Sequence, residues 1–442
     1  MSTLVLREIQ GKDGQPVSFP TGILSGAGYG DIGLPGTQGF GVGVCATPPA
    51  GMAKMAGTDD PASDNYGNYI YADGSVMVWI PAFYYKYGTG VNGLAINQVD
   101  IKPFSYFTTV AVANALGYAL HRAFYDNGLV QAGFFIDKYL PSNNAGTASS
   151  LKNGNPLSTN GVHNPISGLT GAPANFYYGT IAAAKTRGAT FFVASQFQRA
   201  ALALLALAHG QAATSTAWCA WYDVAGVMNF PKGCNNNALG DQNDAAILYV
   251  TDGYSNAAKT GSANLFSRTT HNGQNCGVCD LNGDLWEVSP GLTVASDVAK
   301  FYVLGIAAQM KAMTAGAGGG LDLWGTEAQI LAAGYQELGA TYGALTASSS
   351  QKLFGAAAQV LSEATSGLAW QAAGAGIPLV GGVGGANLFG NDGLWDYRPA
   401  SMCPFAGGSR SNGADAGVWA LFLNGARGDT LATVGFRAAL YL

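Results

Sequence analysis

The sequence predicts an α+β fold built from short strands, a long helix and extended loops. Residues 75–87 form a run of β-branched and aromatic side chains, and Pro81 within that run is typical of an edge strand or a bulge. Residues 133–139 form a second strand-like run. Residues 191–209 carry apolar side chains at helical spacing instead, which indicates a long buried helix.

The composition favours a rigid, loop-rich protein that works outside a cell or in a virus particle. Of the 442 residues, 48% are hydrophobic, only 11% are charged and 64 are glycines. The charged share is about half of the ~25% found in typical domains, so small polar residues must form much of the surface. The net charge of −5 and the pI of about 5.3 argue against a nucleic-acid partner.

Neither a membrane-spanning segment nor an export signal is expected. The longest apolar stretch, residues 200–208, is well short of the ~18 residues that a spanning helix needs. The opening residues 1–8 lack a basic region followed by an apolar run, which is the pattern of a secretory signal. We therefore expect no signal peptide, no membrane insertion and assembly in the cytoplasm of the producing cell.

Two stretches differ in composition from the rest of the chain. Residues 1–64 are rich in Gly and Pro with short apolar pieces, which predicts a small β-rich segment for attachment or oligomerisation. A loosely packed leader is the alternative. Residues 295–376 are Ala-rich, with helical spacing that glycines interrupt, and they predict an inserted helical element. Residues 65–442 then form one domain that contains this insertion.

Two groups of side chains have the spacing of metal ligands. Asp284 and Glu287 follow Asp280 and Asn282 on a Gly-containing loop, and such alternating oxygen ligands make calcium a candidate. Hydrogen bonds from the loop backbone to these carboxylates are the alternative. The pair Cys276 and Cys279 has the spacing of half a zinc site, to which Cys219 and Cys234 could add the rest; buried free thiols are the alternative.

Three motifs resemble one known fold. They are the segment 280–288 (Asp-Leu-Asn-Gly-Asp-Leu-Trp-Glu-Val), the Gly-Gly-Ser turn at 407–409 and the closing Gly-Phe-Arg at 435–437. The first is similar to the Asp-Met-x-Gly-Asn-Val-Trp-Glu-Trp signature of C-type-lectin-like domains of the formylglycine-generating-enzyme type, and the other two resemble their ending. The resemblance implies such a domain over residues 65–442, with calcium often held near the Trp-Glu segment.

The segment from Gly407 to Arg437 also resembles, without a gap, a region of the proteins that diversity-generating retroelements vary. It corresponds to the part of those proteins that differs from copy to copy. These proteins include the tropism determinants at phage tail tips. The resemblance implies a receptor-binding surface of short side chains on loops above an apolar framework. Within this framework, Trp286, Trp395, Phe436 and Arg437 are expected to be buried or half-buried, with Arg437 paired or bonded to backbone carbonyls. A surface hairpin without a ligand is the alternative. The positions implied to contact the receptor are Ser409, Ser411, Asn412, Gly413, Asp415, Phe422, Asn424, Gly425, Asp429, Leu431, Thr433 and Val434.

Catalysis is not expected. Formylglycine-generating enzymes carry a cysteine pair shortly after the Gly-Gly-Ser turn, whereas residues 409–435 contain no cysteine and Cys403 precedes the turn. Without a thiolate pair there is no soft site for copper(I). The four histidines are scattered along the chain.

The resemblance therefore implies a phage or prophage tail receptor-binding protein. Its expected partners are a host cell-surface receptor (protein or glycan), two further copies of itself in a homotrimer, and phage tail or baseplate proteins. Its expected location is the virion. A structural baseplate or tail-fibre subunit is the second interpretation, and an oxidase of the formylglycine-generating type is the third.

Overall fold

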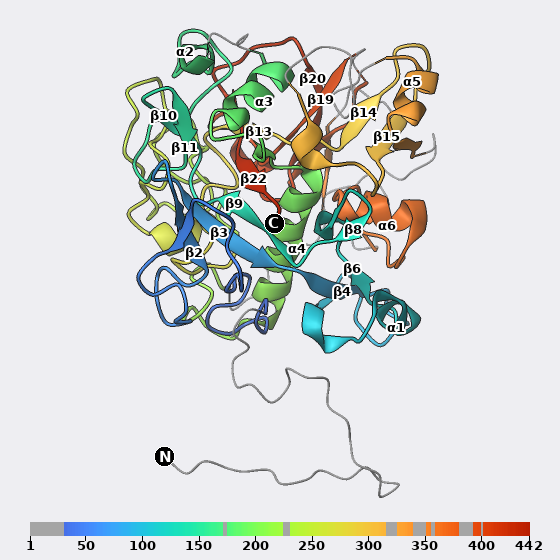
Figure 1. Cartoon of the computed structure of the whole chain (residues 1–442). Coiled ribbons are helices and arrows are strands. Elements are labelled where there is room, and N and C mark those ends of the chain that lie inside the picture. The colour runs from blue at the N-terminus through green and yellow to red at the C-terminus, as the bar shows by residue number, and fades with distance from the viewer. Residues whose placement is uncertain are drawn as a thin grey trace, which may run out of the picture.

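A buried helix lies at the centre of the molecule, among several small sheets (Figure 1). The computed structural model describes residues 31–170, 175–223, 230–314, 325–338, 351–354, 359–379, 392–398 and 401–442. Within these ranges the chain is a mixed α+β protein, as predicted, with two larger sheets and several two- and three-stranded ones. The further prediction of a formylglycine-generating-enzyme-type lectin domain is not confirmed by this architecture.

The first six-stranded sheet contains the strand predicted at 133–139 and the first half of the run predicted at 75–87, whose second half lies in another sheet. Trp79 pairs with Phe135 across the first sheet, and their ring centroids lie 4.7 Å apart. These β-branched and aromatic residues fit a pleated surface that is covered on the core side. In sheet order the strands are β1 (Met52–Lys54), β2 (Asn68–Tyr71), β3 (Val76–Pro81), β9 (Gly133–Asp137), β22 (Ala438–Leu440) and β12 (Phe192–Val193).

The second six-stranded sheet carries the C-terminal motifs. It brings the Trp-Glu segment beside the closing strands, since Trp286 pairs with Val434 in a parallel register. In sheet order its strands are β17 (Gln351–Leu353), β18 (Gly393–Trp395), β20 (Leu421–Ala426), β19 (Met402–Ala406), β13 (Trp286–Val288) and β21 (Val434–Gly435). The chain crosses from this sheet to the first one through Phe436 and Arg437, because β21 and β22 belong to different sheets.

Smaller sheets surround these two. A three-stranded sheet consists of β14 (Leu292–Val294), β15 (Phe301–Leu304) and β16 (Tyr335–Glu337). A second consists of β5 (Val99–Pro103), β4 (Phe83–Tyr87) and β6 (Ala119–Leu120). The two-stranded pairs are β10 (Ser142–Asn144) with β11 (Thr147–Ser149), and β7 (Tyr125–Asp126) with β8 (Leu129–Val130).

The predicted long helix is α4, which spans Gln196–Ala212. Ser195 begins it with a capping box, in which its side chain accepts from the backbone of Gln198 and the Gln198 side chain accepts from the backbone of Ser195. Every residue from Gln196 to His209 is buried, and the polar residues of the helix bond inside the fold, as Arg199 does to Glu287. The other α-helices described are α1 (Val110–Ala115), α2 (Ser167–Thr170), α3 (Tyr177–Lys185), α5 (Glu327–Ala332) and α6 (Gly367–Gly374).

Residues 31–64 pack into the main core of the chain. Phe40 and Val42 are fully buried in the main core, and the Phe40 ring stacks on His209 of α4 at 5.1 Å. Strand β1 completes the first sheet. Residues 31–64 therefore pack against their own chain, because their few apolar side chains are buried against α4. Residues 1–30 lie outside the described ranges.

The predicted helical insertion at 295–376 is helical only in part. Its described residues form β15, β16 and β17 as well as α5 and α6, and 307–313 contain only a 3-10 turn at Met310–Ala312. The glycines and the β-branched residues near 301–304 have low helix propensity, and they interrupt the helical pattern before a long helix can form. Residues 315–324, 339–350, 355–358 and 380–391 lie outside the described ranges.

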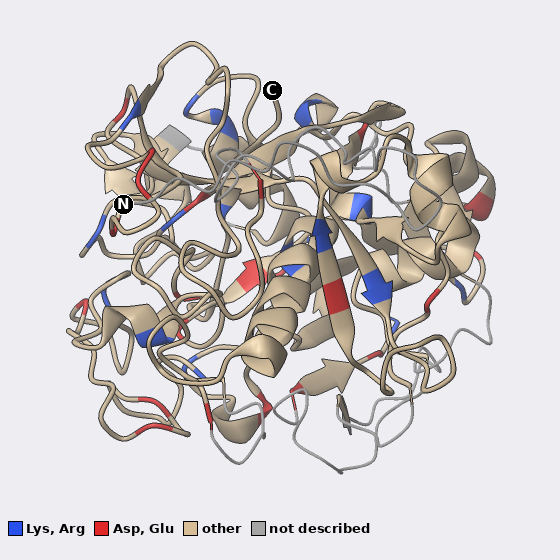
Figure 2. Cartoon of the chain, turned by 90° about the horizontal axis from the view of Figure 1, so that it is seen from below, with Lys and Arg blue, Asp and Glu red and all other residues tan. Residues whose placement is uncertain are grey.

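Many of the few charges lie in the interior. Figure 2 shows acidic and basic residues scattered over the fold without gathering by sign. Fully buried cations include Arg122, Arg187, Arg199, Arg427 and Arg437. The surface is consequently even poorer in charge than the composition indicates. Among the described helices, none has the length and apolar character needed to cross a membrane.

Candidate functional site

The C-terminal surface begins at a turn that requires two glycines. Gly407 and Gly408 have φ angles of 96° and 86°, in the region that side chains disfavour. A Cβ atom on Gly407 would lie 2.4 Å from the carbonyl oxygen of Leu281, and one on Gly408 would lie 2.6 Å from Cβ of Ala416. The turn thus brings the following loop close to the 281–284 segment.

The loop after this turn is fixed through its backbone. Ser409 donates from its backbone nitrogen to Oδ1 of Asn412 at 2.8 Å and from its hydroxyl to the same atom at 2.7 Å. The backbone carbonyl oxygen of Asn235 accepts from the nitrogen of Gly413 at 3.1 Å, and the Asn235 side chain donates to the carbonyl oxygen of Gly413. The nitrogen of Arg410 donates to the carbonyl oxygen of Asp284 at 3.0 Å. These contacts hold the loop in one shape, and the hydroxyl of the exposed Ser411 adds a contact to that of Ser409 at 3.3 Å.

Aromatic rings support the strand that follows. Phe422 of β20 lies 5.5 Å from the ring of Trp286 and 5.7 Å from those of Trp395 and Phe405. Trp286 is 6% exposed, Trp395 is half-buried and Phe436 is buried, which confirms the scaffold expected for them. Phe422 is itself half-buried in this cluster, so it belongs to the framework as well as to the surface.

The twelve predicted contact positions separate into three groups. Four are exposed: Ser411, Asn424, Asp429 and Leu431. Five are half-buried: Asn412, Gly413, Asp415, Phe422 and Thr433. Three are buried and are removed from the predicted surface: Ser409, Gly425 and Val434.

Each of the three burials has a physical reason. The Ser409 hydroxyl is turned inward to Asn412. A Cβ atom on Gly425 would lie 2.3 Å from the Phe405 ring, so the strand needs glycine there. Val434 forms part of β21 and is covered on the core side.

Two loops complete the surface, one at residues 158–165 and one that carries Asp252, and the sequence indicated neither of them. Leu431 exchanges hydrogen bonds with Thr159, whose hydroxyl accepts from the Leu431 nitrogen and donates to its carbonyl oxygen, both at 3.0 Å. His163 contacts the carbonyl oxygen of Ala432 at 3.0 Å and the Asp252 carboxylate at 2.6 Å, and this contact helps to lower the Asp252 pKa despite its burial. No local signal marked residues 158–165, because their role depends on partners far away in the chain.

A buried ionic network lies beneath the surface, where the two six-stranded sheets meet. Arg437 donates to both carboxylate oxygens of Glu287 at 3.1 Å, and Arg199 donates to one of them at 3.2 Å. Arg437 also donates to the carbonyl oxygens of Asp137 at 2.8 Å and Cys279 at 2.9 Å. Burial opposes the charge on Arg437, yet the Glu287 carboxylate raises the pKa of Arg437 above its usual value. The expectation that Arg437 is buried and paired is confirmed.

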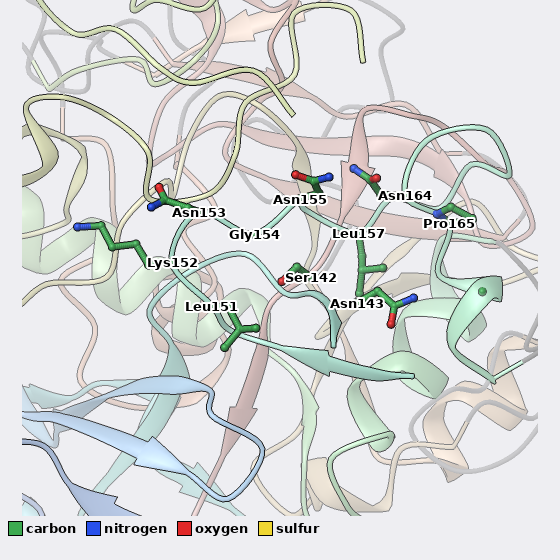
Figure 3. A pocket seen from close by; sticks show the side chains of 11 residues that line it. Ser142, Asn143, Leu151, Lys152, Asn153, Gly154, Asn155, Leu157, Asn164 and Pro165 are labelled. Carbon is green, nitrogen blue, oxygen red and sulfur yellow. The ribbon is translucent and has the colours of Figure 1, made fainter. Parts of the chain in front are cut away.

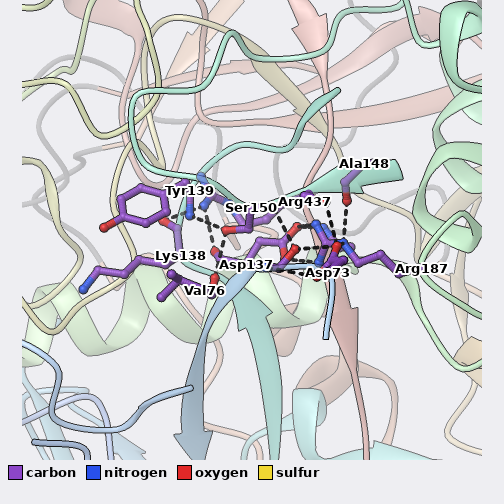
Figure 4. A network of polar contacts seen from close by, with 12 residues as sticks. Asp73, Val76, Asp137, Lys138, Tyr139, Ala148, Ser150, Arg187 and Arg437 are labelled. Carbon is purple, nitrogen blue, oxygen red and sulfur yellow. Dashed lines mark hydrogen bonds and ion pairs between the residues drawn. The ribbon is translucent and has the colours of Figure 1, made fainter. Parts of the chain in front are cut away.

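The network continues into the first sheet, as Figure 4 shows. Arg187 forms a two-pronged pair with Asp137, with Nη2 donating to Oδ2 at 2.9 Å. The same carboxylate accepts from the nitrogen of Ala438 at 2.9 Å. The charged side chains therefore join β9 and β22 of the first sheet to β13 of the second in one rigid support.

The predicted calcium ligands are used otherwise, which corrects this prediction. Both oxygens of Glu287 face guanidinium groups, so a cation there would meet two positive charges. Asp284 accepts from the nitrogen of Ala258 at 3.0 Å, and burial raises the pKa of Asp284 to about 7. Asp284 therefore fits the alternative, in which a carboxylate accepts hydrogen bonds from the loop backbone. Among the described residues, no group of three or more acidic, His or Cys side chains could hold a metal ion.

All six cysteines and the histidines His209 and His271 are buried in the described chain. The cysteines are free, and burial raises the pKa of Cys279 and Cys403. His209 and His271 are buried among backbone partners, and burial lowers the pKa of each to about 4. These histidines therefore bond the fold in their neutral form.

Comparison with known proteins was made by sequence and by structure. No protein-family model matches the chain, and no curated protein matches it. The similar solved structures include variants of the Major Tropism Determinant. The U1 and M1 variants each align with a TM-score of 0.31 and 12% identity, over 83% of this chain and 63% of theirs. The I1 variant aligns with a TM-score of 0.30. The chain thus matches less than two thirds of the length of these proteins, and a TM-score this low supports no inference about function.

Proposed function

We propose that this chain is the receptor-binding protein of a phage or prophage tail. It contacts a host cell-surface ligand, protein or glycan, through the loops between residues 409 and 433. The observation that carries the proposal is a separation of roles within one segment. Exposed side chains at Ser411, Asn424, Asp429 and Leu431 stand on backbone that buried glycines, rings and ion pairs hold in place. Such a surface changes its chemistry without changing its shape.

The double variant Asn424→Arg and Leu431→Arg tests this role. Both side chains are exposed, so the added guanidinium groups stay in water and the fold is retained. We expect fluorescently labelled variant protein to lose at least tenfold in binding to host cells, while Tm changes by less than about 2 °C. The matched control is Val91→Arg, because Val91 is 92% exposed on the loop between β4 and β5 and remote from this surface (Figure 1). Equal binding by both variants and the native chain would refute the proposal.

Assembly as a homotrimer on tail or baseplate proteins is part of the proposal. Burial of charges such as Arg187 and Arg437 leaves a surface with little like-charge repulsion between copies. Sedimentation equilibrium of the purified chain should give three times the monomer mass. A monomer would contradict this part. A trimer whose native form shows no binding to host cells would instead favour the structural-subunit alternative.

The proposal further holds that the chain has no oxidase activity and no nucleic-acid partner. Cys403 is fully buried before the Gly-Gly-Ser turn, and burial raises its thiol pKa, which disfavours the thiolate that copper(I) would need. Purified protein with copper should oxidise a cysteine-containing peptide under oxygen no faster than copper alone does. Copper-dependent oxidation of that peptide above the rate with copper alone would support the oxidase alternative.

A further inference from the structure

An open cavity of about 580 Å³ lies beside the C-terminal surface, within the ~300–1,000 Å³ range of small-molecule sites. Its walls come from one continuous part of the chain, residues 142–168, and Figure 3 shows the lining side chains. The loop that forms its far wall also carries Thr159 and His163, which hold Leu431 and Ala432. The cavity is thus a neighbour of the proposed receptor surface but is built from different residues.

The lining is rich in carboxamides. Four asparagines face the cavity: Asn143, Asn153, Asn155 and Asn164. Oδ1 of Asn143 accepts from Gly146 at 2.9 Å, and the amide nitrogen of Asn164 donates to Asp252 at 2.9 Å. Within the described residues, the side chains of Asn153 and Asn155 have no hydrogen-bond partner. The cavity therefore offers both donors and acceptors to a ligand.

The charges of the lining residues argue against metal ions, amines and anions as ligands. The lining residues include no carboxylate, so a metal ion or an amine would find no counter-charge there. Lys152 is the single cation among them, and its ammonium lies 4.9 Å from the centroid of the Phe266 ring, directed away from the other lining residues (Figure 3). An anionic ligand would thus be poorly neutralised. Leu151, Leu157 and Pro165 add apolar surface between the amides.

The cavity walls are fixed before any ligand arrives. Asn153 donates from its backbone nitrogen to Thr260 at 2.8 Å, and Leu157 donates to Pro141 at 2.8 Å. Ser158 and Ile166 close the far wall through backbone bonds to Asn164 at 2.9 Å and Ser158 at 3.0 Å. A pre-formed site loses little conformational entropy on binding, which suits weak polar ligands.

We infer that this amide-lined cavity binds a neutral glycan through one or two terminal sugar units. Sugar hydroxyls both donate and accept hydrogen bonds, which matches carboxamides, and the C–H faces of a sugar ring match the leucines and the proline. This site is separate from the loops at 409–433, so it does not require that they bind the receptor.

The test is a glycan array with neutral, sialylated and sulfated members, followed by NMR titration of the strongest binders. We expect saturable binding of neutral glycans. The variant Asn153→Gly with Asn155→Ala should weaken that binding at least tenfold. Glycine is chosen at position 153 because its φ angle of 62° disfavours alanine. The control Asn127→Gly replaces an exposed asparagine with a similar φ angle of 53°, outside both the cavity and residues 409–433, and should leave glycan binding unchanged.

The outcomes separate the two proposals. Loss of glycan binding in the cavity variant, with unchanged Tm, supports the inference whatever the C-terminal double variant does to cell binding. No saturable binding to any neutral glycan, a preference for sialylated or sulfated members, or equal binding by the cavity variant and the native chain would each overturn it.

Discussion

Arg437 and Glu287 lie buried and face to face where the two six-stranded sheets meet, with two guanidinium nitrogens each 3.1 Å from a different carboxylate oxygen. The arginine is in the crossover from β21 to β22, and the glutamate is in β13. One ion pair therefore ties the closing residues of the C-terminal motif to the Trp-Glu motif. Arg199 of α4 shares the same carboxylate, so the central helix is joined to them as well.

Removing the shared carboxylate should destabilise the whole fold. Glu287→Ala leaves Arg437 and Arg199 buried without their counter-charge, and we expect a loss of about 3–5 kcal/mol in the free energy of unfolding. Guanidinium chloride unfolding followed by tryptophan fluorescence measures it. Lys54→Ala is the control, since Lys54 and Asp59 form a pair whose side chains are 45% and 52% exposed. That change should cost at most about 1 kcal/mol. Similar losses in both variants would contradict the structural role of the buried network.

The paired glycines should resist substitution by alanine. Gly407→Ala and Gly408→Ala each place a side chain in the left-handed region, at about 1–2 kcal/mol, and add contacts of 2.4 and 2.6 Å to neighbouring atoms. We expect lower Tm values for both variants, together with weaker host-cell binding. Gly428→Ala is the matched control, because nothing lies within 4 Å of a Cβ atom there. A Tm for Gly407→Ala equal to that of the control would show that the turn adapts.

The aromatic support under β20 should carry considerable stability. Trp286 is 6% exposed and contacts Trp395 and Phe422, so Trp286→Ala should cost about 3–5 kcal/mol. Chemical denaturation again gives the value. Trp218→Ala removes a tryptophan that is 42% exposed and should change stability by about 0.5 kcal/mol. If the two truncations had equal effects, the ring cluster would not be the support that its geometry indicates.

Stability should depend on pH through Asp284. Burial raises the pKa of this carboxyl from 3.8 to about 7, against the opposing influence of Arg410 at 3.9 Å. The folded chain therefore keeps a proton that the unfolded chain releases, and the stability associated with it declines as pH rises from about 4 through 7.

The variant Asp284→Asn isolates this effect. Asparagine keeps the acceptor for the Ala258 nitrogen and tolerates the φ angle of 52°. We expect the variant to gain stability relative to the native chain at pH 8, with the difference shrinking towards pH 4–5. Tm values measured across this range provide the test, and parallel curves for the two proteins would contradict a raised pKa.

Local patterns in the sequence were sufficient for several elements. The aromatic and β-branched run gave β3 and β4, and the apolar run at 133–139 gave β9, because alternation and side-chain type reflect a strand directly. The helical spacing gave α4, although the capping box at Ser195 begins the helix five residues after the predicted start. Trp286, Phe436 and Arg437 were correctly expected to be buried.

What the tertiary structure alone decided was which distant residues meet. The Thr159–Leu431 hydrogen bonds join residues 272 positions apart, and nothing in residues 158–165 indicates such a partner locally. The same reason explains the inward Ser409, the covered Val434 and the apolar side chains of 31–64 that pack on α4. Propensity and periodicity act within a few residues, whereas burial depends on surfaces that the rest of the chain supplies. The sequence thus determined strands β3, β4 and β9, the central helix and the motif at the C-terminal surface. Only the folded chain determined which side chains of that motif face the solvent.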